Sequence, residues 1–320
     1  MKEETAKGRA AMRNNPDPLW KYMSPEKKRC LVTGHKGYIG THLYKTLERL
    51  GHDVLGIDLK DDHDILQDLN GGTSGEAFHP LYFNFKPEYI FHLACIPRVA
   101  YSIEEPVKTM TNNVLATTNV LNFAHKVGAK RVIYSGSSSV VGDGTSPNSP
   151  YGLQKLISEM DCKLYSKLYW LDTVTLRYFN VYSPDQEANG PYSTAIAAFM
   201  DAVKSGKTPF ITGDGTQRRD MLHVRDAVMA NLFAMEREDD FAGTNFDVGT
   251  GNNISLNEVK EIVNNYHPDI KFNYVDPREG DVLLTKADTK PINKLGWKSH
   301  YDIYTGLRQC FSQARRKSQN

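Results

Sequence analysis

Cysteine is scarce in this chain of 320 residues, and the four cysteines are scattered along it. Cys30, Cys95, Cys162 and Cys310 show none of the close pairings that a metal site or a disulfide framework requires. Cys30 and Cys95 stand in apolar runs, where cysteine usually serves as a small buried side chain. We therefore expect free thiols, a reducing compartment and no metal site.

Long hydrophobic runs and an excess of charge of one sign are also missing. No apolar stretch reaches the roughly 20 residues that cross a bilayer as a helix, and the first residues lack the apolar core of a signal peptide. The formal net charge is +1, and acidic and basic residues are interspersed. These absences argue against membrane proteins and nucleic-acid-binding proteins, and we expect a cytoplasmic protein.

What the sequence does contain near its start is a strand, a glycine-rich turn and a helix in succession. Residues 30–32 are apolar and predict a buried strand, and residues 41–50 have the apolar spacing of a helix. Between them lie Gly34, Gly37 and Gly40. Glycines in this context let a backbone approach a pyrophosphate at the amino end of a helix. An ordinary structural turn is the alternative interpretation, but the flanking strand and helix favour a dinucleotide site.

A second strand, predicted over residues 53–57, ends at Asp58. A carboxylate in this place accepts hydrogen bonds from the ribose of adenosine. It would also repel the 2′-phosphate of NADP, so Asp58 favours NAD. The Lys36 ammonium would soften that preference if it faced the ribose, but lysine is more often a solvated surface group.

After the second strand, strands and helices alternate. Strand-like apolar runs cover residues 89–95, 131–135 and 172–179, and helical spacing covers residues 106–126 and 150–168. Near-continuous apolar strands separated by helices predict a parallel sheet that is covered on both faces. The expected fold class is therefore α/β, a Rossmann-type doubly wound parallel sheet.

Beyond about residue 180 the pattern changes to shorter elements and loops rich in Gly, Asp and Asn. The short strands expected there are residues 210–212, 221–224, 246–248 and 271–274. This half predicts a smaller mixed α/β lobe at the carboxyl ends of the main strands, where ligands bind in open α/β sheets. The expected division is a polar N-terminal extension (1–28), a Rossmann domain (29–180) and a substrate-binding lobe (181–320), with some segments of the lobe returning to the Rossmann domain.

A second informative stretch begins at Ser149, which can cap a helix, and Pro150, which suits its first position. Tyr151 and Lys155 are then one turn apart on one face of that helix. A lysine ammonium near a phenol favours the phenolate and so lowers the tyrosine pKa toward the range of a usable base. Such pairs are also common on solvated helices. Here the preceding strand runs into the serine cluster 135–139, which supplies hydroxyls at the carboxyl edge of the sheet, and this context favours a catalytic site.

Taken together, these features resemble the extended short-chain dehydrogenase/reductase family. Within it they resemble the NAD-dependent nucleotide-sugar epimerase and dehydratase branch, particularly the UDP-glucose and UDP-N-acetylglucosamine 4-epimerases. The resemblance runs from about Lys28 to about Val282, with weaker agreement to Gln309. The motifs that carry it are Thr33–Gly40, His92–Ala94, the Ser137/Tyr151/Lys155 triad, Leu176–Tyr182, Gly213–Asp220 and Arg278–Asp281. The resemblance implies NAD as the cofactor and a UDP-sugar as the substrate.

The resemblance also implies roles for individual residues, each of which could alternatively be a surface or turn residue. Ser137, Tyr151 and Lys155 correspond to the catalytic hydroxyl, the base and the partner of the base. The implied cofactor contacts are Gly34, Gly37, Tyr38, Ile39, Gly40, Asp58, Asp68, Leu69, Leu93, Ala94, Asn113, Tyr151, Lys155 and Tyr178. The implied sugar-nucleotide contacts are Ser137, Ser138, Asn180, Tyr192, Ser193, Arg219, Arg278, Asp281 and Thr285. Two arginines suit a diphosphate because each presents a permanently charged, bidentate fork.

The expected reaction depends on the residues next to the catalytic hydroxyl. Dehydratases of this branch carry Asp and Glu there, and sugar-acid decarboxylases carry Glu, whereas this chain has Ser138 and Ser139. Serines cannot act as carboxylate acids or bases, so the resemblance implies simple oxidation at C4 and return of hydride to the other face of the 4-keto sugar. We expect an NAD-dependent UDP-sugar 4-epimerase that forms a homodimer. A 4,6-dehydratase or ketoreductase stays open, as does a catalytically silent NAD(H)-binding regulator, although silent members typically lose the Tyr or the Lys.

Three features bear on the identity of the sugar. Thr285 falls where the family has a gatekeeper, and a small residue there admits 2-acetamido sugars, so UDP-GlcNAc and UDP-GalNAc join UDP-Glc and UDP-Gal as candidates. The segment 142–151 is shorter than the family's usual acidic loop, and Ile96-Pro97-Arg98 replaces the residues usual after its His-Leu-Ala-Ala. Both departures fall near the expected pocket mouth and leave the sugar open.

Overall fold

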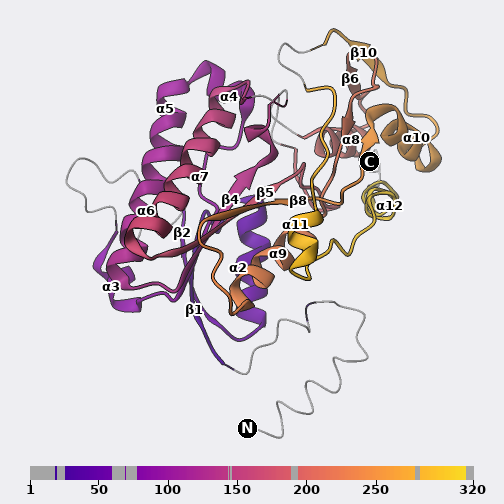
Figure 1. Ribbon diagram of the computed structural model, residues 1–320. Coiled ribbons are helices and arrows are strands. Elements are labelled where there is room, and N and C mark those ends of the chain that lie inside the picture. The colour runs from indigo at the N-terminus through magenta and orange to yellow at the C-terminus, as the bar shows by residue number, and fades with distance from the viewer. Residues whose placement is uncertain are drawn as a thin grey trace, which may run out of the picture.

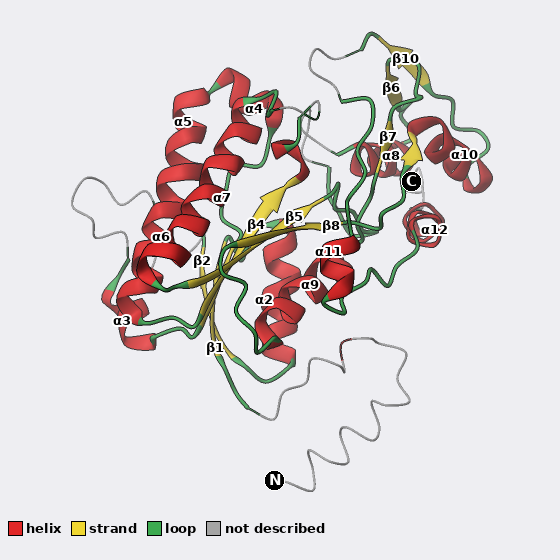
Figure 2. Cartoon of the chain, viewed as in Figure 1, coloured by secondary structure: helices red, strands yellow, loops and turns green. Residues whose placement is uncertain are grey.

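The computed structural model describes residues 26–59, 78–142, 146–188, 194–277 and 282–314, together with Leu19, Leu69 and Gly144. The central feature of this part of the chain is a six-stranded parallel sheet in the order β2-β1-β3-β4-β5-β8 (Figures 1 and 2). Its strands are β1 (Arg29–Thr33), β2 (Asp53–Ile57), β3 (Tyr89–His92), β4 (Arg131–Ser137), β5 (Asp172–Tyr178) and β8 (Thr244–Val248).

Helices cover both faces of this sheet (Figure 1). One face is covered by α3 (Pro80–Phe85), α6 (Ala116–Val127) and α7 (Pro150–Tyr169), with α4 (Val99–Glu104) and α5 (Pro106–Met110) packed against α7. The other face is covered by α2 (Tyr38–Arg49), α9 (Val224–Glu236) and α11 (Lys290–Lys294).

Strand β1 is apolar at three successive positions, Cys30, Leu31 and Val32, because both of its faces are buried. In β1, Cys30 and Val32 belong to the core under α2 and α9, whereas Leu31 belongs to the core under α3 and α6. Side chains alternate across a strand, so a strand between two helical layers must be apolar at successive positions. The predicted fold class, a doubly wound parallel sheet, is confirmed.

The remaining elements form a smaller lobe around a separate core, at the upper right of Figure 1. They are α8 (Ala195–Ser205), β6 (Phe210–Thr212), β7 (Arg218–Arg219), β9 (Ile254–Ser255), α10 (Leu256–Tyr266), β10 (Asn273–Val275) and α12 (Ile303–Gln313). Strands β6 and β10 pair in parallel, and β7 and β9 pair antiparallel. The division of the chain at residue 180 stays a prediction.

Three of the expected strands are corrected by the structure. The strand expected over 89–95 ends at His92, and the residues after it form a loop. Residues 221–224 are not a strand: they make a single bridge, Tyr182 to His223, and α9 begins at Val224. A short apolar run is equally consistent with a buried segment at the start of a helix, which is what residues 221–224 form. The strand expected over 246–248 exists, but as part of β8 in the main sheet.

The long helix expected over residues 106–126 is present with one irregularity. It consists of α5, the π-helical turn η2 (Thr111–Leu115) and α6 in direct succession, and it ends at Val127 before Gly128. A π-turn widens the helix by one residue and is frequent at functional sites. Here it holds the buried Asn113.

The sequence analysis expects no membrane-spanning helix, no metal site and no disulfide, and the structure bears on these expectations only for the residues that it describes. Among the described residues, no helix is long and apolar enough to cross a membrane. In the same part of the chain, no cluster of His, Cys, Asp and Glu side chains is arranged to hold a metal ion. All four cysteines are free. Within residues 1–25, the structure describes only Leu19, which is buried against the core under α2 and α9.

Candidate active site

Strands β1 and β3 lie side by side in the sheet, and the strand order reverses direction between them. Ligands of open α/β sheets bind at such switch points. Gly34 follows β1 with a φ of +72°, and a Cβ on it would lie 2.7 Å from the backbone N of Ala94. A Cβ on Gly40 would lie 2.0 Å from the carbonyl oxygen of Gly34. Both glycines are therefore needed for the close packing of the turn, helix α2 and the loop after β3.

The amino end of α2 is suited to an anion. Its N-cap is Gly37, which has no side chain to cap the helix, and its first turn carries no acidic residue. The first amide groups of a helix are free to bind phosphate oxygens and lie at the positive end of the helix dipole. The Asp58 carboxylate stands beside this turn and accepts a hydrogen bond from the backbone N of Lys36 at 3.0 Å. These residues fit the diphosphate and the adenosine ribose of NAD.

A buried histidine fixes the two loops of this site to each other. His92 Nδ1 lies 2.7 Å from Thr33 Oγ1, and His92 Nε2 lies 3.0 Å from Thr117 Oγ1. Thr33 Oγ1 also accepts a hydrogen bond from the backbone N of Ala94 at 3.2 Å. Burial lowers the pKa of His92 to about 3, and the nearby Lys155 lowers it as well. His92 is therefore neutral, and its role is to hold the segments after β1 and β3 in register.

The other predicted cofactor residues differ in what they contact. Tyr38 Oη lies 2.5 Å from Ser183 Oγ, and Tyr178 Oη accepts a hydrogen bond from Asn231 Nδ2 at 2.7 Å. The carbonyl of Leu69 accepts a hydrogen bond from Asn119 Nδ2 at 2.7 Å. Ile39 packs against the core, and Leu93 follows β3 beside Ala94. Asp68 lies outside the described residues, and the contacts of this whole set with NAD stay predictions.

The predicted catalytic pair lies at the start of α7, where the sequence placed it. Ser149 caps the helix by accepting a hydrogen bond from the backbone N of Gly152 at 3.1 Å. Gly152 allows the helix to approach the loop after β4, since a Cβ there would lie 2.5 Å from the carbonyl oxygen of Ser139. Tyr151 and Lys155 are both buried. Lys155 Nζ donates a hydrogen bond to the carbonyl oxygen of Ser135 at 2.7 Å.

The charges around Tyr151 have opposing effects on its acidity. Burial raises the pKa of Tyr151 to about 12, Lys155 lowers it, the Cys95 thiol raises it, and a hydrogen bond with Ser137 lowers it. Burial lowers the pKa of Lys155, but Cys95, Tyr151 and Glu159 together raise it above its ordinary value. Lys155 therefore keeps its positive charge and favours the phenolate form of its neighbour. Burial outweighs this effect, so the expected net lowering of the Tyr151 pKa is wrong for the protein alone.

The serine cluster extends β4 and ends in the short 3₁₀-helix η3 (Ser138–Val140). Ser137 Oγ accepts a hydrogen bond from the backbone N of Ser139 at 3.2 Å and donates one to Ser139 Oγ at 3.1 Å. The hydroxyl predicted to be catalytic is thus held in place by its neighbours. Neither Ser138 nor Ser139 provides a carboxyl group.

Three of the predicted sugar-nucleotide residues come together from distant parts of the chain. Asn180 Nδ2 donates to the carbonyl oxygen of Asp220 at 2.7 Å and to Thr285 Oγ1 at 3.4 Å. Asp220 in turn donates its backbone N–H to the carbonyl oxygen of Thr285 at 3.1 Å. Arg219 is the chain neighbour of Asp220 and ends the short strand β7. Tyr192, Ser193, Arg278 and Asp281 lie outside the described residues.

Three residues near the catalytic pair were not expected from the sequence. Ser102 Oγ accepts a hydrogen bond from the backbone N of Tyr151 at 3.0 Å. Gln154 Oε1 accepts a hydrogen bond from Asn113 Nδ2 at 2.8 Å, and Gln154 Nε2 donates one to Thr109 Oγ1 at 2.9 Å. The prediction that Cys95 is a buried hydrophobic residue is wrong: it is only partly buried, and its thiol interacts with Lys155. The signal that could have located it is the departure from the family pattern that begins directly after it.

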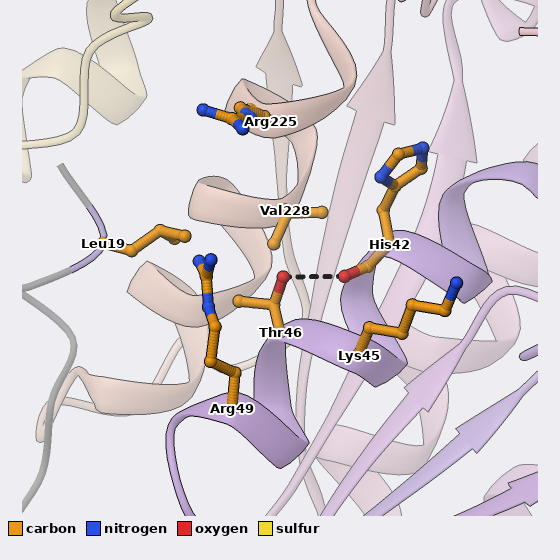
Figure 3. A pocket seen from close by; sticks show the side chains of 7 residues that line it. All are labelled: Leu19, His42, Lys45, Thr46, Arg49, Arg225 and Val228. Carbon is orange, nitrogen blue, oxygen red and sulfur yellow. Dashed lines mark hydrogen bonds between the residues drawn. The ribbon is translucent and has the colours of Figure 1, made fainter. Parts of the chain in front are cut away.

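A further hollow lies between α2 and α9 (Figure 3). It is lined by Leu19, His42, Lys45, Thr46, Arg49, Arg225 and Val228. The lining residues from α2 lie in its middle and carboxyl-terminal turns, not at its amino end, and the others are Leu19 and two residues of α9. None of the predicted site residues is among them. We therefore assign the hollow no part in the chemistry.

The fold and the site define the class of protein: a dinucleotide-dependent α/β enzyme with a Tyr/Lys pair at the carboxyl edge of its sheet. A model of the NAD dependent epimerase/dehydratase family matches residues 30–249. A putative UDP-glucose 4-epimerase of Methanocaldococcus jannaschii is 31% identical over 309 residues, which cover 87% of this chain and 96% of the relative. The chain therefore belongs to the NAD-dependent epimerase/dehydratase family, and its cofactor is NAD.

Solved structures agree with this assignment. UDP-glucose 4-epimerase from Thermotoga maritima, with UDP-glucose, matches with a TM-score of 0.81 and 30% identity over 89% of this chain and 97% of that one. UDP-N-acetylglucosamine 4-epimerase from Methanobrevibacter ruminantium, in complex with UDP-N-acetylmuramic acid, matches with a TM-score of 0.80 and 30% identity over 90% of this chain and 98% of that one. Other relatives include a UDP-glucuronate 4-epimerase and a UDP-N-acetyl-alpha-D-glucosaminuronate decarboxylase. Membership of the family therefore leaves the sugar and the exact reaction open.

Proposed function

We propose that this protein epimerises a UDP-hexose at C4. It would interconvert UDP-Glc and UDP-Gal, and likewise interconvert UDP-GlcNAc and UDP-GalNAc. The observation that carries the proposal is the buried Tyr151/Lys155 pair beside a hydroxyl cluster without a carboxylate. Such a site is equipped to move one proton on and off a hydroxyl group. It is not equipped to eliminate water, which needs a carboxylic acid and a carboxylate base next to the leaving group.

In this proposal each residue of the triad has one task. Tyr151, as the phenolate, takes the proton of the sugar's 4-hydroxyl and later returns it. Lys155 stabilises the phenolate by its charge, and the Ser137 hydroxyl donates a hydrogen bond to the sugar oxygen as it becomes a carbonyl. Bound NAD supplies the hydride acceptor for C4. The 4-keto sugar then turns over in the site, so that hydride returns to the opposite face of C4.

The lobe would hold the rest of the substrate. Asn180 and Arg219 are proposed to contact the diphosphate, and Arg278, Asp281, Tyr192 and Ser193 are proposed to complete the contacts with the nucleotide. Thr285, which lies within hydrogen-bonding distance of Asn180, would face the substituent on C2 of the sugar. Its small side chain leaves room for an acetamido group.

The alternatives differ from this proposal in the residues they need. A 4,6-dehydratase or a decarboxylase would need a carboxyl group at position 138 or 139, where this chain has serine. A ketoreductase uses the same Tyr/Lys pair but releases an oxidised or reduced sugar and consumes its cofactor. A silent NAD(H)-binding regulator would have no need of a buried, hydrogen-bonded Lys155.

We also propose that the protein works as a homodimer in the cytoplasm. Helix α7 carries large apolar side chains that are exposed, and α5 and η2 next to it carry three more. The aliphatic residues among them are Val107, Met110, Leu115, Leu153, Met160, Leu164 and Leu168. An exposed apolar stripe of this kind marks a protein–protein interface, and a second copy of the chain would bury it.

The proposed function is tested by NMR of purified protein with NAD⁺, offered UDP-Glc and UDP-GlcNAc in separate tubes. We expect the C4 epimer to appear in both tubes. A Thr285→Tyr variant should keep its activity on UDP-Glc and lose at least about tenfold on UDP-GlcNAc, the cost of forcing a bulky group into a filled pocket. A 4-keto-6-deoxy product would move the protein to the dehydratases, and no change in either tube, with NAD bound, would favour another nucleotide or the silent regulator.

A further inference from the structure

A closed ring of polar contacts joins the first turns of α2 to the loop that follows β5. Tyr38 Oη lies 2.5 Å from Ser183 Oγ, and Ser183 Oγ donates a hydrogen bond to Asp185 Oδ1. The other carboxylate oxygen of Asp185 lies 3.2 Å from His42 Nε2. His42 follows Tyr38 by one helical turn, and their two rings meet edge to face with centroids 5.7 Å apart. We call these four side chains the clasp.

The direction of each hydrogen bond in the clasp follows from the groups that make it. Ser183 has one hydroxyl proton and donates it to Asp185, so the Tyr38 hydroxyl donates to Ser183. A carboxylate only accepts, so His42 donates its Nε2 proton to Asp185. Burial lowers the pKa of His42, and although Asp185 raises it, the pKa stays below its ordinary value. Burial raises the pKa of Tyr38. Both side chains from α2 are therefore uncharged at neutral pH, and Asp185 carries the charge of the clasp.

The clasp connects the expected NAD site to the core of the smaller lobe. Tyr38 is the first residue of α2, directly after the N-cap Gly37, and the amides of this turn fit the diphosphate of NAD. On the other side, the buried Ser183 directly follows Tyr182, whose ring belongs to the core of the lobe. The backbone N of Tyr182 also donates a hydrogen bond to the carbonyl oxygen of Leu222 at 2.9 Å. The amino end of α2 is therefore held from the side of the lobe, by a loop that is itself anchored.

The clasp is separate from the contacts that pack α2 on the sheet. The buried residues of α2 are Gly40, Leu43 and Leu47, whereas Tyr38 and His42 are half-buried and lie on another face of the helix. The carboxylate that completes the clasp is exposed. Such contacts add little to the core, but they fix the orientation of a turn that is suited to an anion. Fixing a binding turn before its ligand arrives lowers the entropic cost of binding.

We propose that Ser183 and Asp185 are positioning residues for NAD. Through Tyr38 they hold the first turn of α2 in the orientation that binds the diphosphate of the cofactor, and so they slow its release. Without the clasp, ordering this turn would reduce the free energy gained when NAD binds. The inference concerns the cofactor alone and holds for whichever sugar the enzyme takes.

The test measures the dissociation constant of NAD⁺ by fluorescence titration, and the rate of NAD⁺ release from the loaded protein. Ser183→Ala is expected to raise the dissociation constant roughly 3- to 10-fold, which is the effect of losing one net hydrogen bond, mainly through faster release. Asp185→Ala should have an effect of the same direction. Asp185→Asn should bind NAD⁺ nearly as the wild type does, because an amide can accept from Ser183 and donate to the other tautomer of His42. Glu187→Ala removes the same charge from an exposed position two residues further on and should leave NAD⁺ binding unchanged.

Two further measurements separate positioning of the cofactor from a merely structural role. Tyr38→Phe removes the hydroxyl that Ser183 holds, so its effect on NAD⁺ binding and that of Ser183→Ala should not add in the double variant. UDP, used as a probe of the lobe, should bind Ser183→Ala as tightly as it binds the wild type. Unchanged NAD⁺ binding in Ser183→Ala, additive effects in the double variant, or an equal loss of UDP affinity would each overturn the inference. Neither measurement depends on epimerisation, so failure of this inference and failure of the 4-epimerase proposal are distinguishable.

Discussion

A Tyr151→Phe variant is expected to lose about 10²- to 10⁴-fold in kcat, the usual contribution of a positioned proton-transfer group. The substitution removes a hydroxyl group that is buried next to Lys155 and hydrogen-bonded to Ser137. This hydroxyl is the group that is proposed to accept the proton of the 4-hydroxyl. The phenyl ring keeps the volume of the side chain, so folding and NAD⁺ binding should be unchanged. Steady-state turnover of a UDP-sugar by NMR and NAD⁺ binding by fluorescence titration measure the two effects separately.

The pH dependence of kcat/KM in the wild type gives a second test of the role of Tyr151. Because burial raises the pKa of Tyr151 to about 12 in the protein alone, the phenolate is a minor form at neutral pH. The value of kcat/KM should therefore rise with pH, and in Tyr151→Phe this rise should be absent. Tyr169→Phe, at the exposed end of the same helix, serves as the control and should behave as the wild type. Turnover of Tyr151→Phe near the wild-type rate would show that another group is the base.

An Asp172→Ala variant is expected to lower the free energy of unfolding by about 3–5 kcal/mol, the cost of removing one partner of a buried ion pair. Asp172 begins β5 and pairs with Arg131, which begins β4. Its carboxylate also accepts hydrogen bonds from the backbone N of Phe241 at 2.8 Å and of Ala242 at 2.9 Å. Arg131 is further engaged with the carbonyl oxygen of Ala234 at 2.6 Å. Removing the carboxylate leaves the guanidinium buried without its counter-charge.

This polar cluster lies at the amino edge of the sheet, opposite the carboxyl edge that carries the site. Denaturant unfolding of Asp172→Ala should therefore show the lower free energy of unfolding, while kcat and KM of the folded fraction stay near the wild-type values. Asp201→Ala, an exposed position on α8, should change the unfolding free energy by less than about 0.5 kcal/mol, as is usual for the surface. A loss below about 1 kcal/mol in Asp172→Ala would mean that the buried pair contributes no more than an exposed one.

The features that local sequence patterns predicted correctly depend on short-range physics. The turn at Gly34 needs a positive φ, the helix at Pro150 needs a cap and a proline at its first position, and an apolar strand needs two covered faces. Each of these requirements acts over a few residues, so it is visible in the sequence. That Tyr151 and Lys155 lie on the same face of one helix follows from helical periodicity alone, so this feature could be predicted from the sequence.

The features that the sequence did not reveal are contacts between distant segments. Nothing local indicates that Asn113 and Gln154 share a hydrogen bond, or that Ser102 accepts one from the backbone of Tyr151. The same holds for Cys95, whose surroundings are set by a helix that begins far along the chain. Residues 221–224 show the related difficulty that a short apolar run is compatible with more than one buried structure.

The central claim is that the hydrogen on C4 leaves the sugar and returns to the same carbon. The most direct test offers the protein a UDP-hexose that carries deuterium at C4, and locates the label in the product by NMR. The account predicts that the epimer retains deuterium at C4, and that the same reaction in D₂O introduces no deuterium at C5 or C6. Label at C6, or solvent deuterium at C5, would contradict it and show that the site performs an elimination instead.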